Sequence, residues 1–150
     1  MKTTKLKGVQ LLLILSFSLC STLLFAQEKS VQEQLMSKEW MLDATETRSY
    51  DIALDFAEKE LLLFIIIRGE RSSTSVPYYL SDSIETQFDN SKVGKRTNGK
   101  YIVYSYSGEK NDSFFIEEIL ELTDNLLKYK DIKGEKGEML ILRGVPKENK

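Results

Sequence analysis

The sequence predicts an all-β fold: an antiparallel up-and-down β-barrel of about eight or nine strands with a short N-terminal helix. From Trp40 onward, apolar and polar residues alternate with a period of two, and β-branched and aromatic residues are frequent. The connections between these runs are short and rich in Gly, Asn, Asp and Ser, so they join neighbouring antiparallel strands and leave no room for crossover helices. Closing such a meander into a barrel removes its exposed edges.

The first expected element of the folded region is a short helix over "VQEQLM". Ser30 can act as its N-cap, and Glu33 follows three residues later, as in a capping box. The alternating pattern then predicts strands near 39–47, 50–57, 60–70, 75–81, 84–89, 99–107, 113–122, 126–133 and 138–144. We expect one domain over 27–145 and a flexible tail over 146–150.

The run "LLLFIII", residues 61–67, departs from this alternation. Seven consecutive apolar residues cannot alternate between core and water, so both faces of this strand should be covered. The inner face is expected to look into the barrel. The outer face should take either the N-terminal helix or a partner protein.

Residues 1–26 have the three parts of a secretory signal peptide. Lys2, Lys5 and Lys7 precede an apolar segment, and Ala26 stands before the polar "QEKS". Ser and Thr interrupt the apolar segment, which falls short of the roughly 20 residues of a membrane span. We therefore expect cleavage after Ala26 and a periplasmic or secreted protein, whereas an uncleaved signal would hold the chain at a membrane.

Cys20 leaves a second cellular location open, because a Cys near the end of such a segment can be lipidated and anchor an outer-membrane lipoprotein. The bulky Leu19 before it and the apolar "STLLFA" after it argue against lipidation, which needs a small residue before the Cys and is usually followed by a polar linker. Cys20 is therefore interpreted as part of the apolar segment.

Removing residues 1–26 makes the chain more acidic. This segment holds three of the 21 Lys and Arg residues and none of the 23 Asp and Glu residues, which leaves 18 basic against 23 acidic residues and a net charge of −5. No basic excess favours nucleic acid as a partner. The remaining chain of about 124 residues fits one domain that buries roughly two thirds of its unfolded surface.

The chain beyond residue 26 contains neither Cys nor His. Disulfides, thiolate nucleophiles, the usual zinc ligands and Ser-His or Cys-His pairs are therefore excluded. The sequence has no phosphate loop, GxGxxG motif or calcium loop. Adjacent Glu117 and Glu118 should point to opposite faces of a strand, so they are a poor catalytic pair. We expect no cofactor and no metal.

Four features together resemble the small secreted lipocalin-like, calycin-type domain proteins of Gram-negative bacteria. They are the signal ending in "FAQ", the short helix leading to the Trp in "LMSKEWML", the meander of short strands, and the late strands "EEILELTDNLLKYKD". In that family a Trp closes one end of the barrel, and the interior binds small, mostly apolar molecules. The resemblance therefore implies a barrel with an internal ligand.

Trp40, the only Trp of the chain, stands on the first predicted strand. We interpret it as a structural residue. Its apolar surface would seal the floor of the barrel, while its indole N–H would meet a backbone carbonyl or a polar side chain. The alternative is that its ring stacks on a ligand.

Strand alternation also predicts which side chains face the interior. Glu118 shares a predicted inner face with Ile116, and Arg68 shares one with Phe64. The predicted ligand-binding residues are Arg68, Tyr78, Tyr104, Tyr106, Glu118 and Tyr129. Arg68 would bind the anionic end of an amphipathic ligand, and the Tyr rings would cover its body. Alternatively, Arg68 and Glu118 pair with each other or lie at the rim in water.

Three classes of function are consistent with these patterns. The first is a lipocalin-like binder of a small amphipathic or hydrophobic molecule. The second is a protein-interaction module, an inhibitor or assembly partner, that uses the outer face of "LLLFIII" or the Tyr-rich strands around a filled barrel. The third is an enzyme that needs neither metal nor His. Because the sequence has no recognisable residues for such chemistry, we expect no enzyme.

Overall fold

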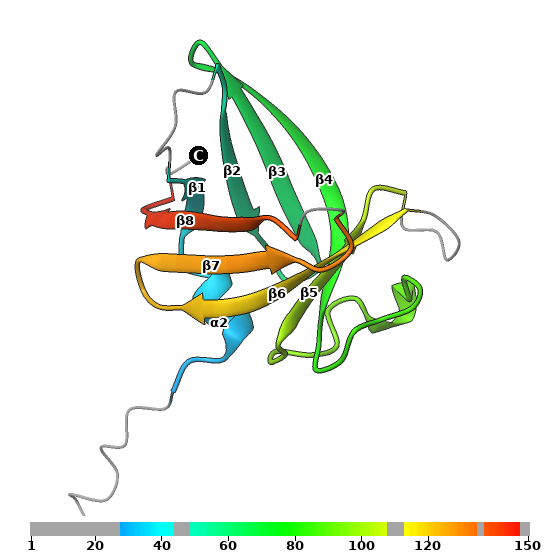
Figure 1. Cartoon of the computed structure of the whole chain (residues 1–150). Helices are drawn as coiled ribbons and strands as arrows, with labels where there is room; N and C mark the ends of the chain where they lie inside the picture. Colours follow the sequence, from blue (N-terminus) through cyan, green and yellow to red (C-terminus); the bar gives the residue numbers. More distant parts are fainter. Residues whose placement is uncertain (1–27, 44–48, 108–112, 135–136, 148–150) are drawn as a thin grey trace, which may run out of the picture.

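The computed structural model describes residues 28–43, 49–107, 113–134 and 137–147. The fold is all-β, with eight antiparallel strands in an up-and-down, ring-like sheet and one small helix (Figure 1). The elements are α2 (Val31–Met36), β1 (Glu39–Leu42), β2 (Asp51–Phe56), β3 (Glu60–Ile67), β4 (Glu70–Ser81), the short 3₁₀ turn η1 (Asn90–Lys92), β5 (Tyr101–Ser105), β6 (Phe114–Leu122), β7 (Leu126–Asp131) and β8 (Met139–Val145). The all-β prediction is confirmed. The predicted signal peptide, with Cys20, lies outside the described residues.

The sheet closes on itself because each strand pairs with the next along the chain and β8 pairs with β1. Trp40 on β1 lies opposite Leu54 on β2 and opposite Gly144 on β8. Pairing of the first and last strands leaves neither as a free edge. The register of β6 against β7 shifts between Ile119 and Glu121.

Helix α2 lies at the lower end of the ring in Figure 1. The predicted capping box is confirmed: the Ser30 hydroxyl accepts the Glu33 N–H (3.2 Å), and the Glu33 carboxylate accepts the Ser30 N–H (2.8 Å). Leu35 is fully buried in the core, and the Gln32 side-chain amide donates to the Glu58 carbonyl (2.8 Å). A helix of six residues needs such tertiary contacts, because it is too short to be stable alone.

The strand predicted over 60–70 ends earlier than expected, at Ile67. Arg68 and Gly69 form a two-residue turn with φ of 52° and 84°, and Ile67 pairs with Glu70 at the start of β4. Positive φ at both central residues is the geometry of a type I′ hairpin turn, which matches the twist of antiparallel strands. Arg68 therefore lies on no strand face, and β4 begins before the predicted residue 75.

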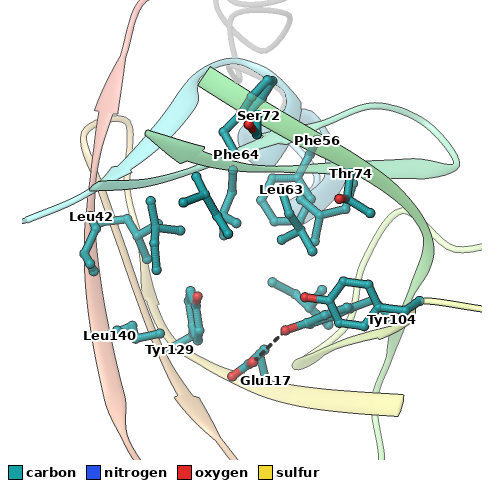
Figure 2. A pocket seen from close by; sticks show the side chains of 17 residues that line it. Leu42, Phe56, Leu63, Phe64, Ser72, Thr74, Tyr104, Glu117, Tyr129 and Leu140 are labelled. Atoms are coloured by element: carbon teal, nitrogen blue, oxygen red, sulfur yellow. Dashed lines mark hydrogen bonds between the residues drawn. The ribbon is translucent and has the colours of Figure 1, made fainter. Parts of the chain in front are cut away.

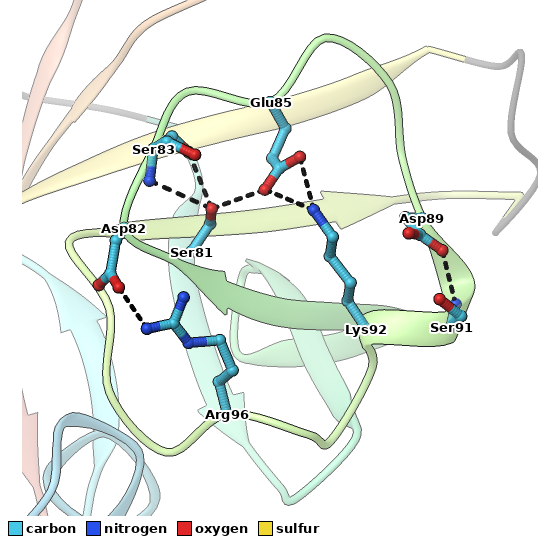
Figure 3. Close-up of polar contacts among 8 residues, drawn as sticks. All are labelled: Ser81, Asp82, Ser83, Glu85, Asp89, Ser91, Lys92 and Arg96. Atoms are coloured by element: carbon cyan, nitrogen blue, oxygen red, sulfur yellow. Dashed lines mark hydrogen bonds and ion pairs between the residues drawn. The ribbon is translucent and has the colours of Figure 1, made fainter.

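The strand predicted over 84–89 is absent from the structure. Residues 82–100 instead form a connection between β4 and β5 whose regular structure is the short turn η1. Figure 3 shows how polar side chains hold this connection: Lys92 Nζ lies 2.8 Å from the Glu85 carboxylate, and the Ser81 hydroxyl donates to the same carboxylate (2.6 Å). Side chains rather than a strand ladder therefore fix the segment.

This connection covers the outer face of β4, β5 and β6. Phe88 is fully buried there, with its ring centroid 5.3 Å from that of Tyr79. The outer cluster comprises Tyr79, Phe88, Tyr101, Val103, Phe114 and Ile116. The inner cluster comprises Leu35, Trp40, Leu54, Phe56, Leu61, Val76, Tyr78, Leu80, Ile102, Leu127, Tyr129 and Leu142. Strands β4 to β6 thus carry apolar side chains on both faces.

The outer face of "LLLFIII" is not covered by the helix, which was one of the two predicted alternatives. The Arg71 guanidinium lies 4.1 Å from the centroid of the Phe64 ring and donates to the Glu39 carboxylate (2.9 Å). Phe64 is buried on this outer face, opposite Ser73 of β4. The methylene groups of a long basic side chain here cover an apolar ring while its charge finds an acid.

The predicted tail is attached to the ring at its first residues. Lys147 Nζ lies 2.5 Å from the Asp55 carboxylate and donates to the Phe56 carbonyl (3.1 Å). The contact joins the segment after β8 to β2.

Candidate ligand-binding site

The ring encloses a cavity of about 360 Å³ to which all eight strands contribute. Its apolar lining is Leu42, Ile52, Leu54, Phe56, Leu61, Leu63, Phe64, Ile65, Ile102, Leu140 and Leu142. Its polar lining is Ser72, Thr74, Tyr104, Tyr106, Glu117 and Tyr129. Small-molecule sites typically have volumes of roughly 300 to 1,000 Å³, with apolar walls and a few polar groups. The cavity has these properties.

Strand alternation explains how the chain builds this lining. Successive residues of a strand point to opposite faces, so a strand contributes mainly every second side chain. On β3 the lining also includes Phe64, between Leu63 and Ile65. On β4, Ser72 and Thr74 line the cavity, and Ser73 between them points outward. On β5, Ile102 and Tyr104 line it while the residue between them belongs to the outer cluster.

Glu117 on β6 is the acidic side chain of the described lining, and it is only 6% exposed. Its Oε1 accepts a hydrogen bond from the Tyr104 hydroxyl at 3.3 Å. Its Oε2 is buried and has no hydrogen-bond partner among the residues that the structure describes. Figure 2 shows Glu117, Tyr104 and Tyr129 on one side of the cavity, across from Leu63 and Thr74. The carboxyl group and two of the phenol groups therefore share one wall, while the Thr74 hydroxyl lies on the opposite wall.

The surroundings of Glu117 disfavour its charged form. Burial raises its pKa to about 7, and the nearby Asp131 carboxylate adds to the rise, while the hydrogen bond from Tyr104 acts in the opposite direction. Burial also raises the pKa of the Tyr104 and Tyr129 hydroxyls, which therefore stay protonated at neutral pH. Glu117 thus changes its charge near neutral pH, whereas the two hydroxyls do not.

Three aromatic rings extend this wall toward solvent. Phe115 stacks on Tyr104 with ring centroids 5.0 Å apart, and Tyr106 meets the Phe115 ring edge-on at 5.6 Å. Tyr106 is 58% exposed, so it lies at the rim of the cavity. Exposure therefore increases along this wall, from the buried Glu117 carboxylate to the exposed Tyr106 ring.

The closed end of the ring is a packed floor. Trp40 is completely buried, and its indole N–H donates to the Leu35 carbonyl of helix α2 (2.8 Å). A Cβ atom added at Gly144 would lie 3.3 Å from the Trp40 ring, so the absent side chain lets the ring pack on the β8 backbone. Tyr78, predicted as a ligand-binding residue, is also buried here, and its hydroxyl donates to the Ala57 carbonyl (2.7 Å). Neither ring is part of the cavity lining.

Three of the predicted site residues, Tyr104, Tyr106 and Tyr129, line the cavity. The two charged ones do not. Glu118 lies on the outer face opposite Tyr101, where Lys100 Nζ is 2.6 Å from its carboxylate. The predicted inward orientation of Glu118 is wrong. Its face of β6 is apolar because it packs in the outer cluster, and not because it faces the cavity.

Arg68 is also misplaced by the prediction. It lies in the turn between β3 and β4, beside a separate surface depression that Tyr50 and Glu70 also line. The predicted Arg68–Glu118 pair is therefore not formed, and neither residue contributes to the described lining of the cavity.

Sequence reasoning missed Glu117, Ser72 and Thr74. Glu117 could have been placed from the pairing of β6 with β5, because it lies opposite Ile102, which is on the same face of β5 as the predicted site residue Tyr104. Hydropathy favoured the opposite face of β6, because the face that carries Glu118 is otherwise apolar. Ser72 and Thr74 fall in a polar part of β4 that the sequence predicted to precede the strand.

The described residues offer no group of three or more Asp, Glu, Cys or His arranged to hold a metal ion. In the same part of the chain, no helix is long and apolar enough to cross a membrane. Among the described residues that line the cavity there is no Lys or Arg. The cavity lining therefore carries acid and hydroxyl groups but no basic side chain in the residues described.

Comparison with protein-family models, with curated proteins and with solved structures finds no match for this chain. A ring-like antiparallel sheet supports many unrelated functions. The sheet alone therefore assigns no function.

Proposed function

We propose that this protein is a lipocalin-like β-barrel protein that binds one small amphipathic or hydrophobic molecule inside the ring. The observation that carries the proposal is the cavity of about 360 Å³, with mostly apolar walls and with Glu117, Tyr104 and Tyr129 together on one side. Such a lining suits a ligand with an apolar body and one polar end. At roughly 30 Å³ for a water-sized group, the cavity has room for about 12 such groups.

The cavity favours this function over a protein-interaction module with a filled barrel. Close-packed protein interiors contain few voids larger than a water molecule, so a cavity of this size differs from an ordinary core. Ile65 lines the cavity, and the half-exposed Ile67 lies at the end of β3. Isolated exposed apolar side chains are normal on a soluble protein. They give little support to a large docking surface.

We propose a periplasmic or secreted location, because residues 1–26 have the pattern of a secretory signal. The mature chain would then begin at Gln27. An intact mass of the purified protein tests this start, and acyl chains on Cys20 would instead indicate an outer-membrane lipoprotein.

Blocking the cavity tests the proposed function. Thr74 lines the cavity, whereas Ser73 points outward on the same strand. Thr74→Phe therefore places a ring in the cavity, and Ser73→Phe adds the same ring outside it as a matched control. We expect the neutral fluorescent probe N-phenyl-1-naphthylamine to bind the wild type and Ser73→Phe equally, and Thr74→Phe about tenfold more weakly, which corresponds to about 1.4 kcal/mol.

The contrary result is equal binding of this probe to all three proteins. It would place the probe outside the cavity and remove the main support for an internal ligand. Circular dichroism of both variants establishes that the comparison is made between folded proteins.

A further inference from the structure

Glu117 is a buried acid whose polar atoms the described protein satisfies only in part. One carboxylate oxygen accepts the Tyr104 hydroxyl, and the other is buried without a partner among the described residues. Proteins rarely leave a buried polar atom unpaired, and an unpaired buried charge is costly. Oε2 lies beneath the surface of the lining, but Glu117 itself lines the cavity, so a ligand there can supply the opposite charge that the carboxylate lacks.

Among the residues that the structure describes, the groups that face Glu117 supply no positive charge. Tyr104 faces it from β5 and Tyr129 from β7, and both hydroxyls stay neutral. Asp131 lies opposite Glu117 at the end of β7 and is itself an acid. Tyr106, beyond the end of β5, completes the titratable groups on this wall among the described residues. In the described lining, the Glu117 carboxyl group and three phenol rings therefore form the polar end of the cavity, with the Asp131 carboxylate nearby.

This environment distinguishes three kinds of ligand head group. An anionic head would be repelled by the carboxylates. A neutral hydroxyl could donate to the Glu117 carboxylate, but it would leave the buried charge unbalanced. A protonated amine supplies both a hydrogen-bond donor and the opposite charge, and charge-assisted hydrogen bonds are the strongest of the three. The faces of the Tyr rings also attract a cation within about 6 Å of the ring centre.

We propose that the cavity selects amphipathic molecules whose polar end is a protonated amine, and that Glu117 is the residue that binds this amine. The inference rests on the proposed function, since it assigns the chemistry of the head group at the same site. This protonated amine replaces the anionic head group that the sequence predicted on the basis of Arg68.

Binding of such an amine strengthens as the pH rises through the titration of Glu117. Because the pKa of Glu117 is about 7 in the absence of ligand, Glu117 is neutral in most protein molecules below that pH. An alkylamine resembles Lys, whose pKa is about 10.4, and stays protonated throughout. Affinity for the amine therefore increases from pH 6 to pH 8, while affinity for a neutral ligand with the same apolar chain is unaffected by this titration.

Three probes with one apolar chain test the assignment: decylammonium, 1-decanol and decanoate, titrated calorimetrically at pH 8. In wild type we expect decylammonium to bind tightest and decanoate weakest. Glu117→Gln should weaken decylammonium by roughly tenfold to a hundredfold, the range for a charged hydrogen bond, and leave 1-decanol unchanged. Glu118→Gln is the matched control, because Glu118 lies on the outer face and its replacement should leave all three affinities unchanged.

Two kinds of failure are distinguishable. Equal affinities of wild type for decylammonium and 1-decanol, a preference for decanoate, or an equal loss of amine and alcohol in Glu117→Gln would overturn the amine assignment and leave an internal apolar site. Binding of none of the three probes to wild type would overturn the proposed function together with the assignment.

Discussion

Replacing Trp40 by Ala is expected to lower the free energy of unfolding by about 3 to 5 kcal/mol, the usual loss when a large buried aromatic is truncated. Trp40 is completely buried between the helix and the strands, and its indole N–H donates to the Leu35 carbonyl. The variant loses this packing and leaves the carbonyl without its donor. A typical domain has a stability of roughly 5 to 15 kcal/mol, so the loss is a large share of the total.

Urea denaturation followed by circular dichroism measures this loss without relying on Trp emission. Trp40→Phe should have an intermediate effect, because it keeps part of the apolar surface and removes the N–H. The exposed Ile84→Ala is the surface control and should change stability by no more than about 0.5 kcal/mol. If Trp40→Ala were as mild as Ile84→Ala, or if wild-type emission matched that of Trp in water, Trp40 would not be a core residue.

The second large effect is a pH-dependent stabilisation in Glu117→Gln. The folded-state pKa of Glu117 is raised from 4.5 to about 7, so ionisation is harder in the folded than in the unfolded chain. Between these two pH values the folded state binds more protons than the unfolded state, and stability falls as the pH rises. The cost is absent well below pH 4.5 and complete above pH 7. Each pKa unit corresponds to 1.36 kcal/mol, which gives a full cost of about 3 kcal/mol.

Glu117→Gln removes this cost because its amide does not ionise. Its stability relative to wild type should therefore increase by about 2 to 3 kcal/mol between pH 5 and pH 8. Urea denaturation at the two pH values measures the change, and Glu118→Gln should show no such gain. A stability difference between Glu117→Gln and wild type that is the same at both pH values would show that Glu117 titrates normally in the folded protein.

The sequence predicts the architecture well because the determining signals are local. Short polar connections imply antiparallel neighbours, and the Ser30–Glu33 capping box fixes the helix start. The turn at Arg68 and Gly69 escaped prediction because Arg seldom adopts a positive φ, so an apolar strand ending in Arg reads as continuous. The false strand over 84–89 contains the apolar Phe88, which is buried by tertiary packing on another strand pair and not by a strand of its own.

The site was harder to predict than the fold, because a one-residue error reverses the face of a strand. On β6, Phe114 and Ile116 are buried under the 82–100 connection, while Glu117 points into the cavity. The apolar face of β6 is therefore not the face that lines the cavity. For this reason the sequence predicted Glu118 in the interior, where the structure has Glu117. Only the register against β5 resolves the choice, and that register is a long-range property.

Methyl NMR during titration with 1-decanol tests most directly whether a small molecule binds inside the ring. If the ligand binds inside the ring, we expect saturable shifts for the methyl groups of Leu54, Leu63 and Leu142, which line the cavity. The methyl groups of Val103 and Ile116, in the outer cluster, should stay unchanged and serve as internal controls. Shifts restricted to outer or exposed methyl groups, or no saturable shift at any methyl group, would contradict the proposal of an internal ligand site.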